Sequence, residues 1–264
     1  MNALAGHTGS YATHANEDAL AGIAAAGFRH VELAHVPGAV EHVDVHKDPA
    51  EVKARLDHYG LDAVSISGHS NLTTPEGLEH GLAVVRWADK FGLLIVNTAV
   101  GGHAPDVDES ESAFLANIGT LADAAQAAGI TIALEIHGDL MASGEIAIPL
   151  LDRIGHPAVK VNYDTANVEH YSGARAEDDL PLIADRGANV HLKDARGGRG
   201  EWDFPAIGEG HVDFGRVLAI LSEAGYEGPY AVEIEFSGEP WPPLDEVTEA
   251  MRASREALAA HGLS

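Results

Sequence analysis

Residues 132–138 read IALEIHG, and the glutamate in the middle of this stretch ends a run whose polarity alternates with a period of two. Ile132 and Leu134 fall on one face of an extended chain, while Ala133 and Glu135 fall on the other. Alternation of this kind is typical of a β-strand with one buried apolar face. We therefore expect Glu135 at the end of a strand, on the face opposite to its apolar side chains.

Three later stretches repeat this arrangement. They read AVKVNYD at 158–164, ANVHLKD at 188–194 and YAVEIEF at 230–236. In each stretch one face is apolar and the other carries a potential metal ligand, and these ligands are Asp164, His191 and Glu233. Together with Glu135, four consecutive strands each present one side chain of a type that binds divalent cations.

A glycine followed at once by an apolar, strand-like run recurs seven times, at Gly27, Gly60, Gly92, Gly129, Gly155, Gly187 and Gly225. Glycine suits the left-handed residue that ends many helices, so each one predicts a joint between a helix and the next strand. With a first strand at 2–7, this gives eight strand–helix units in 264 residues. Such regular alternation favours a closed (β/α)8 TIM barrel, formed as a single domain over residues 1–264. A doubly wound open sheet is the alternative, although no glycine-rich phosphate loop follows the first strand.

The segments between these strands have helical signatures. Thr74 before a proline is a typical helix start, and Asp213 is a second N-terminal cap. Apolar residues recur at helical spacing within 109–128 and after both caps. The three stripes are Phe114, Ile118, Leu121 and Ala125; Leu78, Leu82 and Val85; and Phe214, Val217, Leu218 and Leu221. The loops 36–47 and 194–210 are longer than a barrel needs, and we expect both at the mouth, because loops after strand ends form the active-site face.

The composition is that of an acidic globular protein. Apolar residues make up 45 %, and 41 Asp and Glu against 16 Lys and Arg give a formal net charge of −25. This charge repels phosphate backbones and anionic membrane surfaces, so neither nucleic acid nor a membrane is an expected partner. The absence of cysteine excludes disulfides, thiolate nucleophiles and sulfur metal sites. No apolar run approaches the roughly 20 residues of a membrane span, and we find no signal-peptide pattern, so the expected location is the cytoplasm.

The four polar strand ends predict a metal centre. Adjacent parallel strands lie about 4.8 Å apart, so side chains from four successive strand ends can converge on one ion. The candidate ligands are Glu135, Asp164, His191 and Glu233. Three carboxylates and one imidazole form an oxygen-rich set suited to Mn²⁺, Mg²⁺ or Co²⁺, with Zn²⁺ as a further option. One such residue alone is more often a hydrogen-bonded rim residue, but four compatible ligands on consecutive strands favour a shared ion.

Four further residues are candidate substrate contacts. His69 and Glu32 end the third and second strands. Each either contacts the substrate or is a rim residue without such a contact. His137 lies two residues beyond the first ligand, so it could contact a substrate or support the metal site. Lys193 lies two residues beyond the histidine ligand and could hold an oxyanion or form a buried ion pair with a barrel carboxylate. His103, which follows two glycines, is a further candidate.

The same stretches resemble the xylose isomerase-like TIM barrels, the sugar phosphate isomerase/epimerase superfamily that includes endonuclease IV. The resemblance covers nearly the whole chain and rests on ALEIHG, NYDTAN, VHLKD, IGEGHVDF and GPYAVEIEF. It implies that the four candidate ligands bind Mn²⁺ or a similar ion, as in the ketose 3-epimerases of the family. It also implies that Glu135 and Glu233 are the catalytic pair, which exchanges a proton with the sugar on opposite faces. Alignment from the Gly-Pro at 228–229 favours Glu233 over Glu235 as the last ligand.

Two positions depart from the pattern of the ketose 3-epimerases. Asn167 stands where those enzymes place a substrate-binding histidine, and Gly197 stands where they place an arginine. Asn167 is therefore a candidate substrate contact in this chain. The resemblance therefore implies the metal site for this chain, but it does not imply the recognition of a free ketohexose.

The expected function is that of a divalent-metal-dependent isomerase or epimerase of a small keto-sugar or keto-polyol. A cation on the carbonyl and its neighbouring hydroxyl would stabilise an enediolate while a carboxylate removes the proton between them. If a leaving group lies β to the carbonyl, the same carbanion expels it, so a lyase or dehydratase acting on an inosose or a 3-keto-glycoside is the alternative. A non-catalytic binding protein conflicts with the presence of both carboxylates, and a nuclease conflicts with the low basic count. Homodimers are common among such relatives, so the resemblance implies a homodimer.

Overall fold

Eight parallel strands form a closed barrel in the computed structural model, which describes residues 2–102, 107–237 and 240–263. The barrel strands are β1 (Leu4–His7), β2 (His30–Val36), β4 (Asp62–Ser67), β5 (Ile95–Thr98), β6 (Thr131–Glu135), β7 (Val159–Asp164), β8 (Gly187–Leu192) and β9 (Tyr230–Val232). They follow one another in chain order, and β1 pairs with both β2 and β9, which closes the barrel. A two-residue strand, β3 (Val40–Glu41), pairs antiparallel with β2. The predicted (β/α)8 barrel is confirmed.

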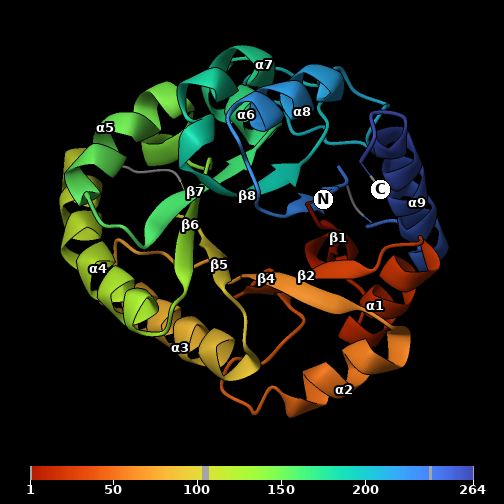
Figure 1. Ribbon diagram of the computed structural model, residues 1–264, viewed down its shortest axis with the longest axis horizontal. Coiled ribbons are helices and arrows are strands. Elements are labelled where there is room, and N and C mark those ends of the chain that lie inside the picture. Colours follow the sequence, from red (N-terminus) through yellow and green to blue (C-terminus); the bar gives the residue numbers. More distant parts are fainter. Residues whose placement is uncertain (1, 103–106, 238–239, 264) are drawn as a thin grey trace.

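Helices surround the strands as an outer ring (Figure 1). They are α1 (Asn16–Ala25), α2 (Ala50–Tyr59), α3 (Pro75–Phe91), α4 (Val107–Ala127), α5 (Gly144–Ile154), α6 (Asn167–Ser172), α7 (Ala176–Asp179), α8 (Phe214–Glu223) and α9 (Leu244–Ala259). The last helix, α9, lies beside α1 and so joins the two ends of the chain on one side of the ring. Among the described residues, no helix has the length and apolar character needed to cross a membrane.

Six of the seven predicted helix–strand joints have a left-handed backbone. Gly27, Gly60, Gly92, Gly129, Gly155 and Gly225 have φ between +56° and +93°. The prediction is wrong for Gly187, which is extended with φ −67° and ψ 138°. The reason is that a 3₁₀ turn at Ala184–Arg186 leads directly into β8, so no α-helix ends there. The left-handed glycine of this unit is Gly173, at the end of the short helix α6.

Both predicted helix caps are present. Thr74 Oγ1 accepts from the backbone N–H of Gly77 (3.1 Å), and Asp213 Oδ1 accepts from that of Arg216 (2.9 Å). Each bond satisfies one of the backbone donors that a helix start leaves without an intrahelical partner. The predicted stripes are buried except for three leucines, which are half-buried against the core. These are Leu78, Leu82 and Leu218.

The barrel interior is polar near its mouth, because alternate side chains of each strand point inward. Asn97, Asn162 and Asn189, from β5, β7 and β8, are fully buried. Asn189 Nδ2 donates to Asn162 Oδ1 (3.1 Å), and Asn97 and Asn189 also donate to the buried carboxylate of Glu32. The opposite faces of the strands supply the apolar core, to which Ile132 and Leu134 belong. The alternation predicted from 132–138 is confirmed.

The two long loops lie at the mouth of the barrel, as predicted. Val36, Ala39 and Val40 from the first loop line a cavity together with Trp202 from the second. The same cavity contains side chains from the ends of β1, β6 and β8. The carboxyl-terminal end of the barrel is therefore the face that carries the candidate site.

Candidate active site and metal centre

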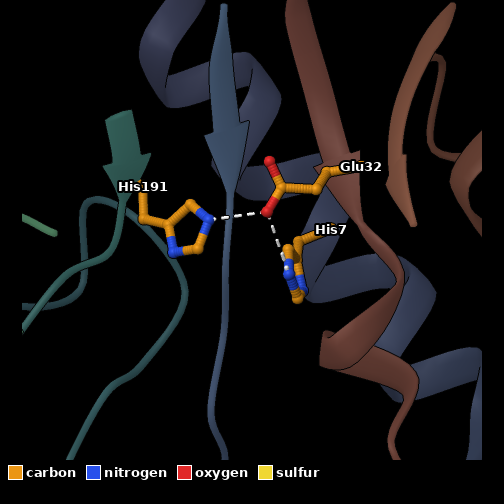
Figure 2. A group of neighbouring side chains, drawn as sticks. All are labelled: His7, Glu32 and His191. Atoms are coloured by element: carbon orange, nitrogen blue, oxygen red, sulfur yellow. Dashed lines mark hydrogen bonds and ion pairs between the residues drawn. The ribbon is translucent and has the colours of Figure 1, made fainter. Parts of the chain in front are cut away.

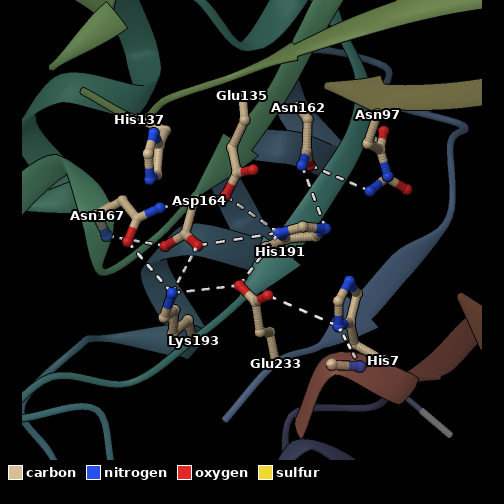
Figure 3. A network of polar contacts seen from close by, with 12 residues as sticks. His7, Asn97, Glu135, His137, Asn162, Asp164, Asn167, His191, Lys193 and Glu233 are labelled. Atoms are coloured by element: carbon tan, nitrogen blue, oxygen red, sulfur yellow. Dashed lines mark hydrogen bonds and ion pairs between the residues drawn. The ribbon is translucent and has the colours of Figure 1, made fainter. Parts of the chain in front are cut away.

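The four predicted ligands meet at the carboxyl ends of four neighbouring strands (Figure 3). Glu135 and Asp164 end β6 and β7, His191 is next to the end of β8, and Glu233 follows β9. His191 Nδ1 lies 3.4 Å from Glu135 Oε1 and 3.3 Å from Glu233 Oε2. It lies 3.9 Å from Asp164 Oδ2, and one ligand atom of each residue falls within 4.8 Å of the other three.

The start of α6 orients two of these carboxylates. Asp164 Oδ1 accepts from the backbone N–H groups of Ala166 (2.9 Å) and Asn167 (2.8 Å), donors that lack an intrahelical partner. This bond pair leaves Asp164 Oδ2 facing the cluster. The side chain of Asn167 donates from Nδ2 to Glu135 Oε1 (3.1 Å). One turn of chain after β7 thus fixes the direction of both carboxylates.

Two buried atoms at the cluster have no hydrogen-bond partner. They are His191 Nδ1 and Glu135 Oε2, although Glu135 Oε2 lies 2.7 Å from His69 Nε2 in an ion pair. Buried polar atoms are normally satisfied, so an imidazole nitrogen without a hydrogen-bond partner that lies among three carboxylates suits a cation. The donor set of three carboxylates and one imidazole also matches a hard divalent ion. The residues present therefore fit a metal ion, which Glu135, Asp164, His191 and Glu233 would hold.

Burial and crowding of the carboxylates favour a proton within the cluster. Burial raises the pKa of Asp164 to about 7, against the opposing charge of Lys193, and Glu233 and Glu135 raise it further. Burial alone would lower the pKa of His191, but neighbouring carboxylates, Glu32 first among them, raise it well above its usual range. Both shifts favour the protonated forms, with which a bound cation would compete.

Metal binding is expected to weaken as the pH falls through 7. The ion must displace the proton of Asp164, so affinity should drop about tenfold per pH unit for each proton displaced. In the metal-free protein, pH acts on the stability of the fold in the opposite direction, so that stability falls as the pH rises. Because the folded pKa of Asp164 lies above its ordinary value of 3.8, its proton stabilises the fold below pH 3.8, and this contribution is lost as the pH rises through about 7. Mn²⁺ titration calorimetry between pH 5.5 and 8, in two buffers, measures affinity and proton release, and a pH-independent affinity without proton release contradicts the assignment.

Lys193 is a fully buried cation within the site. Its Nζ lies 3.4 Å from Asp164 Oδ2 and 3.2 Å from Glu233 Oε2, and it also contacts Glu235. It donates to Asn167 Oδ1 (3.2 Å) as well. Burial opposes its charge, but the three carboxylates raise the pKa of Lys193 well above its usual range. Of the two roles considered from the sequence, the structure shows the buried ion pair.

A cavity of about 300 Å³ adjoins the cluster. Both glutamate ligands line it, as do four of the five predicted substrate contacts, which are His69, His137, Asn167 and Lys193. Glu32, the fifth, is fully buried and lies outside the cavity lining. Its carboxylate is enclosed by hydrogen-bond donors from the barrel interior, so it cannot reach a substrate in this cavity. The expectation of a substrate contact is thus not met for Glu32.

His69 and His137 lie on the side of the cavity next to Glu135. Burial disfavours a charged imidazole at His69, but the carboxylate of Glu135 outweighs it and raises the pKa of His69. His137 Nε2 is hydrogen-bonded to the Tyr171 hydroxyl (2.9 Å), and burial lowers the pKa of His137. A second cavity of about 520 Å³ is lined by both histidines, so the two cavities share a wall. His103 lies outside the described residues.

The sequence patterns missed two residues of the site. His7, at the end of β1, lines the cavity, and its Nδ1 lies 3.6 Å from Glu233 Oε1. Its position at a strand end was a usable signal, but β1 has only four residues and shows no clear alternation. Tyr171 lies on α6, and nothing in its local sequence indicates that it bonds to His137.

Residues 20–257 match the profile of the xylose isomerase-like TIM barrel family. The chain belongs to this family. The match spans every barrel strand except β1, and it includes all four ligands of the cluster. The resemblance inferred from the strand-end motifs is therefore confirmed.

Individual proteins of known activity or structure resemble this chain. An L-ribulose-5-phosphate 3-epimerase (UlaE) of Salmonella paratyphi B is 28 % identical over 228 residues, which cover 81 % of this chain and 76 % of that protein. A D-allulose 3-epimerase from Methylomonas sp. has a TM-score of 0.78 at 22 % identity, over 98 % of both chains. A xylose isomerase-like TIM barrel protein from Mycobacterium smegmatis, in complex with magnesium, has a TM-score of 0.74 at 19 % identity, over 99 % of this chain and 98 % of that one. The structural likenesses establish a shared fold.

Proposed function

We propose that this protein is a divalent-metal-dependent epimerase of a keto-sugar, acting at the carbon next to the carbonyl through an enediolate. The observation that carries the proposal is a pair of glutamates that line one cavity from opposite sides of the ligand cluster (Figure 3). Glu135 ends β6 and Glu233 follows β9, with the strands of the other two ligands between them. A sugar lying between these glutamates would meet one carboxylate on each face.

Epimerisation needs one group to remove a proton and another to return it on the opposite face. A divalent cation in the cluster would polarise the substrate carbonyl and stabilise the negative charge that develops on its oxygen. Either glutamate can serve as the base that removes the proton, because neighbouring cations favour its ionised form, while the other glutamate must carry a solvent-derived proton in order to return one. Burial opposes their ionisation, but His69 and His191 hold the pKa of Glu135 well below its usual range, and Lys193 and His191 do so for Glu233.

The relatives support a ketose as the substrate. The Salmonella relative is an epimerase that acts at carbon 3 of L-ribulose 5-phosphate. The D-allulose 3-epimerase from Methylomonas sp. shares the fold, and a second structure of that enzyme contains D-allulose. These relatives differ in whether the ketose carries a phosphate. The charge of the cavity therefore indicates which of the two kinds of ketose this protein would bind.

The charges around the cavity favour an uncharged keto-sugar. Among the described residues that line the two cavities, Lys193 is the one Lys or Arg, and three carboxylates already surround it. The segments 103–106 and 238–239, which lie outside the described residues, contain no Lys or Arg. Glu76 adds further negative charge to the lining. A phosphate dianion would therefore be repelled at short range in this setting.

A free ketose is expected to be a better substrate than its phosphate ester. With the Mn²⁺-loaded enzyme, kcat/KM for L-ribulose should exceed that for L-ribulose 5-phosphate by at least about tenfold, equivalent to ~1.4 kcal/mol of transition-state binding. Chromatographic detection of the 3-epimer of L-ribulose, D-allulose and L-ribulose 5-phosphate provides the measurement. Preference for the phosphate ester would refute an uncharged substrate and leave the epimerase proposal intact. No 3-epimer from any of these ketoses would count against the epimerase proposal itself.

A lyase acting on a larger keto-sugar is the second candidate. The observation in its favour is the second cavity of about 520 Å³, which shares Val36, His69 and His137 with the cavity at the cluster. This space could hold a ring attached to the reacting sugar. The same proton abstraction by a glutamate would then expel a substituent β to the carbonyl. Release of an aglycone from a 3-keto-glycoside, without formation of a 3-epimer, would favour the lyase.

A further inference from the structure

Glu32 is a fully buried carboxylate of β2 that lies next to the ligand cluster but is not part of it. Its Oε2 accepts three hydrogen bonds, from the hydroxyl of Ser65 (2.5 Å) and the amides of Asn97 (2.7 Å) and Asn189 (3.0 Å). These donors come from β4, β5 and β8, so one oxygen is anchored across the barrel. A carboxylate anchored in this way has a fixed direction for its second oxygen.

The second oxygen of Glu32 faces the metal-site histidine (Figure 2). His191 Nε2 lies 2.7 Å from Glu32 Oε1, whereas His191 Nδ1 faces the carboxylates of the cluster. A ring nitrogen this close to an ionised carboxylate must carry the proton between them, because two lone pairs would repel. Asn162 Nδ2 is farther from the same nitrogen, at 3.2 Å, so the shorter contact decides the tautomer. The Nδ1 lone pair is thereby directed at the cluster.

His7 contacts the same oxygen but is held differently. Its Nδ1 accepts from the backbone N–H of Gly9 (2.9 Å), which leaves its proton on Nε2, 3.3 Å from Glu32 Oε1. A second metal ion among His7, Glu32 and His191 would need a lone pair from each residue. Both histidines instead direct a protonated nitrogen at the carboxylate, His191 in a hydrogen bond and His7 in a longer ion-pair contact, and these contacts explain the group better than a second ion.

We propose that Glu32 is a positioning residue that makes His191 an Nδ1 metal ligand by holding the proton of its Nε2. The inference rests on the metal site of the proposed function and assigns a role to a residue that touches neither the ion nor the substrate. Carboxylates that accept from metal-binding imidazoles fix both the tautomer and the ring orientation, and losing one costs about 10- to 100-fold in metal affinity.

Glu32→Gln tests this role directly. The amide keeps the size of the carboxylate, but its NH₂ group can donate to His191 Nε2 and so move the ring proton to Nδ1, where it blocks the ion. We expect the Kd for Mn²⁺, measured by calorimetric titration at pH 8, to rise about 10- to 100-fold. Nitrogen-15 NMR of the imidazole rings, with Mg²⁺ as the diamagnetic ion, should show His191 protonated at Nε2 in the wild type. In metal-free Glu32→Gln it should show protonation at Nδ1.

Ser65→Ala is the matched control. It removes one donor to Oε2 and leaves the contact between Oε1 and His191 in place, so the tautomer should persist and the Kd should change by less than about threefold. A general loss of packing would weaken metal binding in both variants to the same degree, which contradicts a specific role of Glu32. If Glu32→Gln fails to fold, the wild-type spectrum alone still decides, because protonation of His191 at Nδ1 in the Mg²⁺ form overturns the proposal.

The outcomes separate this inference from the proposed function. A wild type that binds no ion would refute the metal site itself. A wild type that binds one ion per chain, together with a Glu32→Gln variant of equal affinity and unchanged tautomer, would refute only the positioning role. Two ions in the wild type and one in Glu32→Gln would show a second ion at His7, Glu32 and His191, and would also overturn the proposal.

Discussion

Replacing Glu135 or Glu233 by glutamine is expected to lower the rate of epimerisation by about 10²- to 10⁴-fold, the usual contribution of a general acid or base. The amide keeps the shape and one ligating oxygen of each carboxylate but cannot accept the substrate proton. Because the two glutamates serve opposite faces, either substitution alone should stop the conversion of one epimer into the other. The rate is measured at saturating Mn²⁺, so that a weaker affinity for the ion does not enter.

Glu256→Gln provides the control for this pair. Glu256 is an exposed residue of α9, on the outer ring of helices, and the same chemical change there should leave turnover unaltered. Thermal unfolding of all three variants shows whether the fold is retained. If Glu135→Gln or Glu233→Gln turned over within about threefold of the wild type, well short of the usual effect of losing a catalytic base, the two-glutamate mechanism would be wrong.

Removal of a metal ligand should strongly lower the metal content of the protein. Loss of a residue that hydrogen-bonds to a metal ligand lowers metal affinity by about 10- to 100-fold. His191→Ala and Asp164→Asn alter a ligand itself, so we expect them to weaken Mn²⁺ binding by more than this. Elemental analysis after gel filtration should find one ion per chain in the wild type and almost none in either variant. The wild type should also lose thermal stability when a chelator removes the ion, because an ion at 100 times its Kd stabilises the fold by about 2.7 kcal/mol.

His58→Ala is the matched control for the histidine ligand. His58 is exposed on α2 at the outside of the barrel, so its loss should leave the metal content unchanged. A metal content of His191→Ala equal to that of His58→Ala would remove His191 from the ligand set. Retention of the ion by Asp164→Asn alone would mean that a neutral amide oxygen at this position, together with the other three ligands, suffices to hold it.

The barrel and the ligand cluster could be predicted because both depend on local patterns. Period-two alternation places Glu135 on the inner face of a strand wherever that strand lies, and glycine after a helical run marks where the next strand begins. Parallel strands in a closed barrel then bring their carboxyl ends together without further information. This logic failed at Gly187, because the segment before it forms short helical pieces and 3₁₀ turns rather than one helix.

The roles of individual polar residues could not be predicted in this way. Glu32 was expected at the end of a strand, but it is the third residue of β2 (His30–Val36), and its carboxylate is enclosed by donors from strands that are distant in the sequence. Asn167 lines the cavity, as a substrate contact would, but sequence patterns did not show that its side chain also bonds to both Glu135 and Lys193. Such contacts depend on which strands become neighbours across the barrel, and residue spacing does not encode that.

Proton NMR of a single turnover in D₂O tests the proposed chemistry most directly. The Mg²⁺-loaded enzyme would convert D-allulose or L-ribulose, and the hydrogen at carbon 3 of substrate and product would be followed. Two bases on opposite faces predict that the 3-epimer carries solvent deuterium at carbon 3, while the remaining substrate keeps its proton at early times. A 3-epimer that retains the original proton at carbon 3 would contradict removal of that proton by one glutamate and return of a solvent-derived proton by the other.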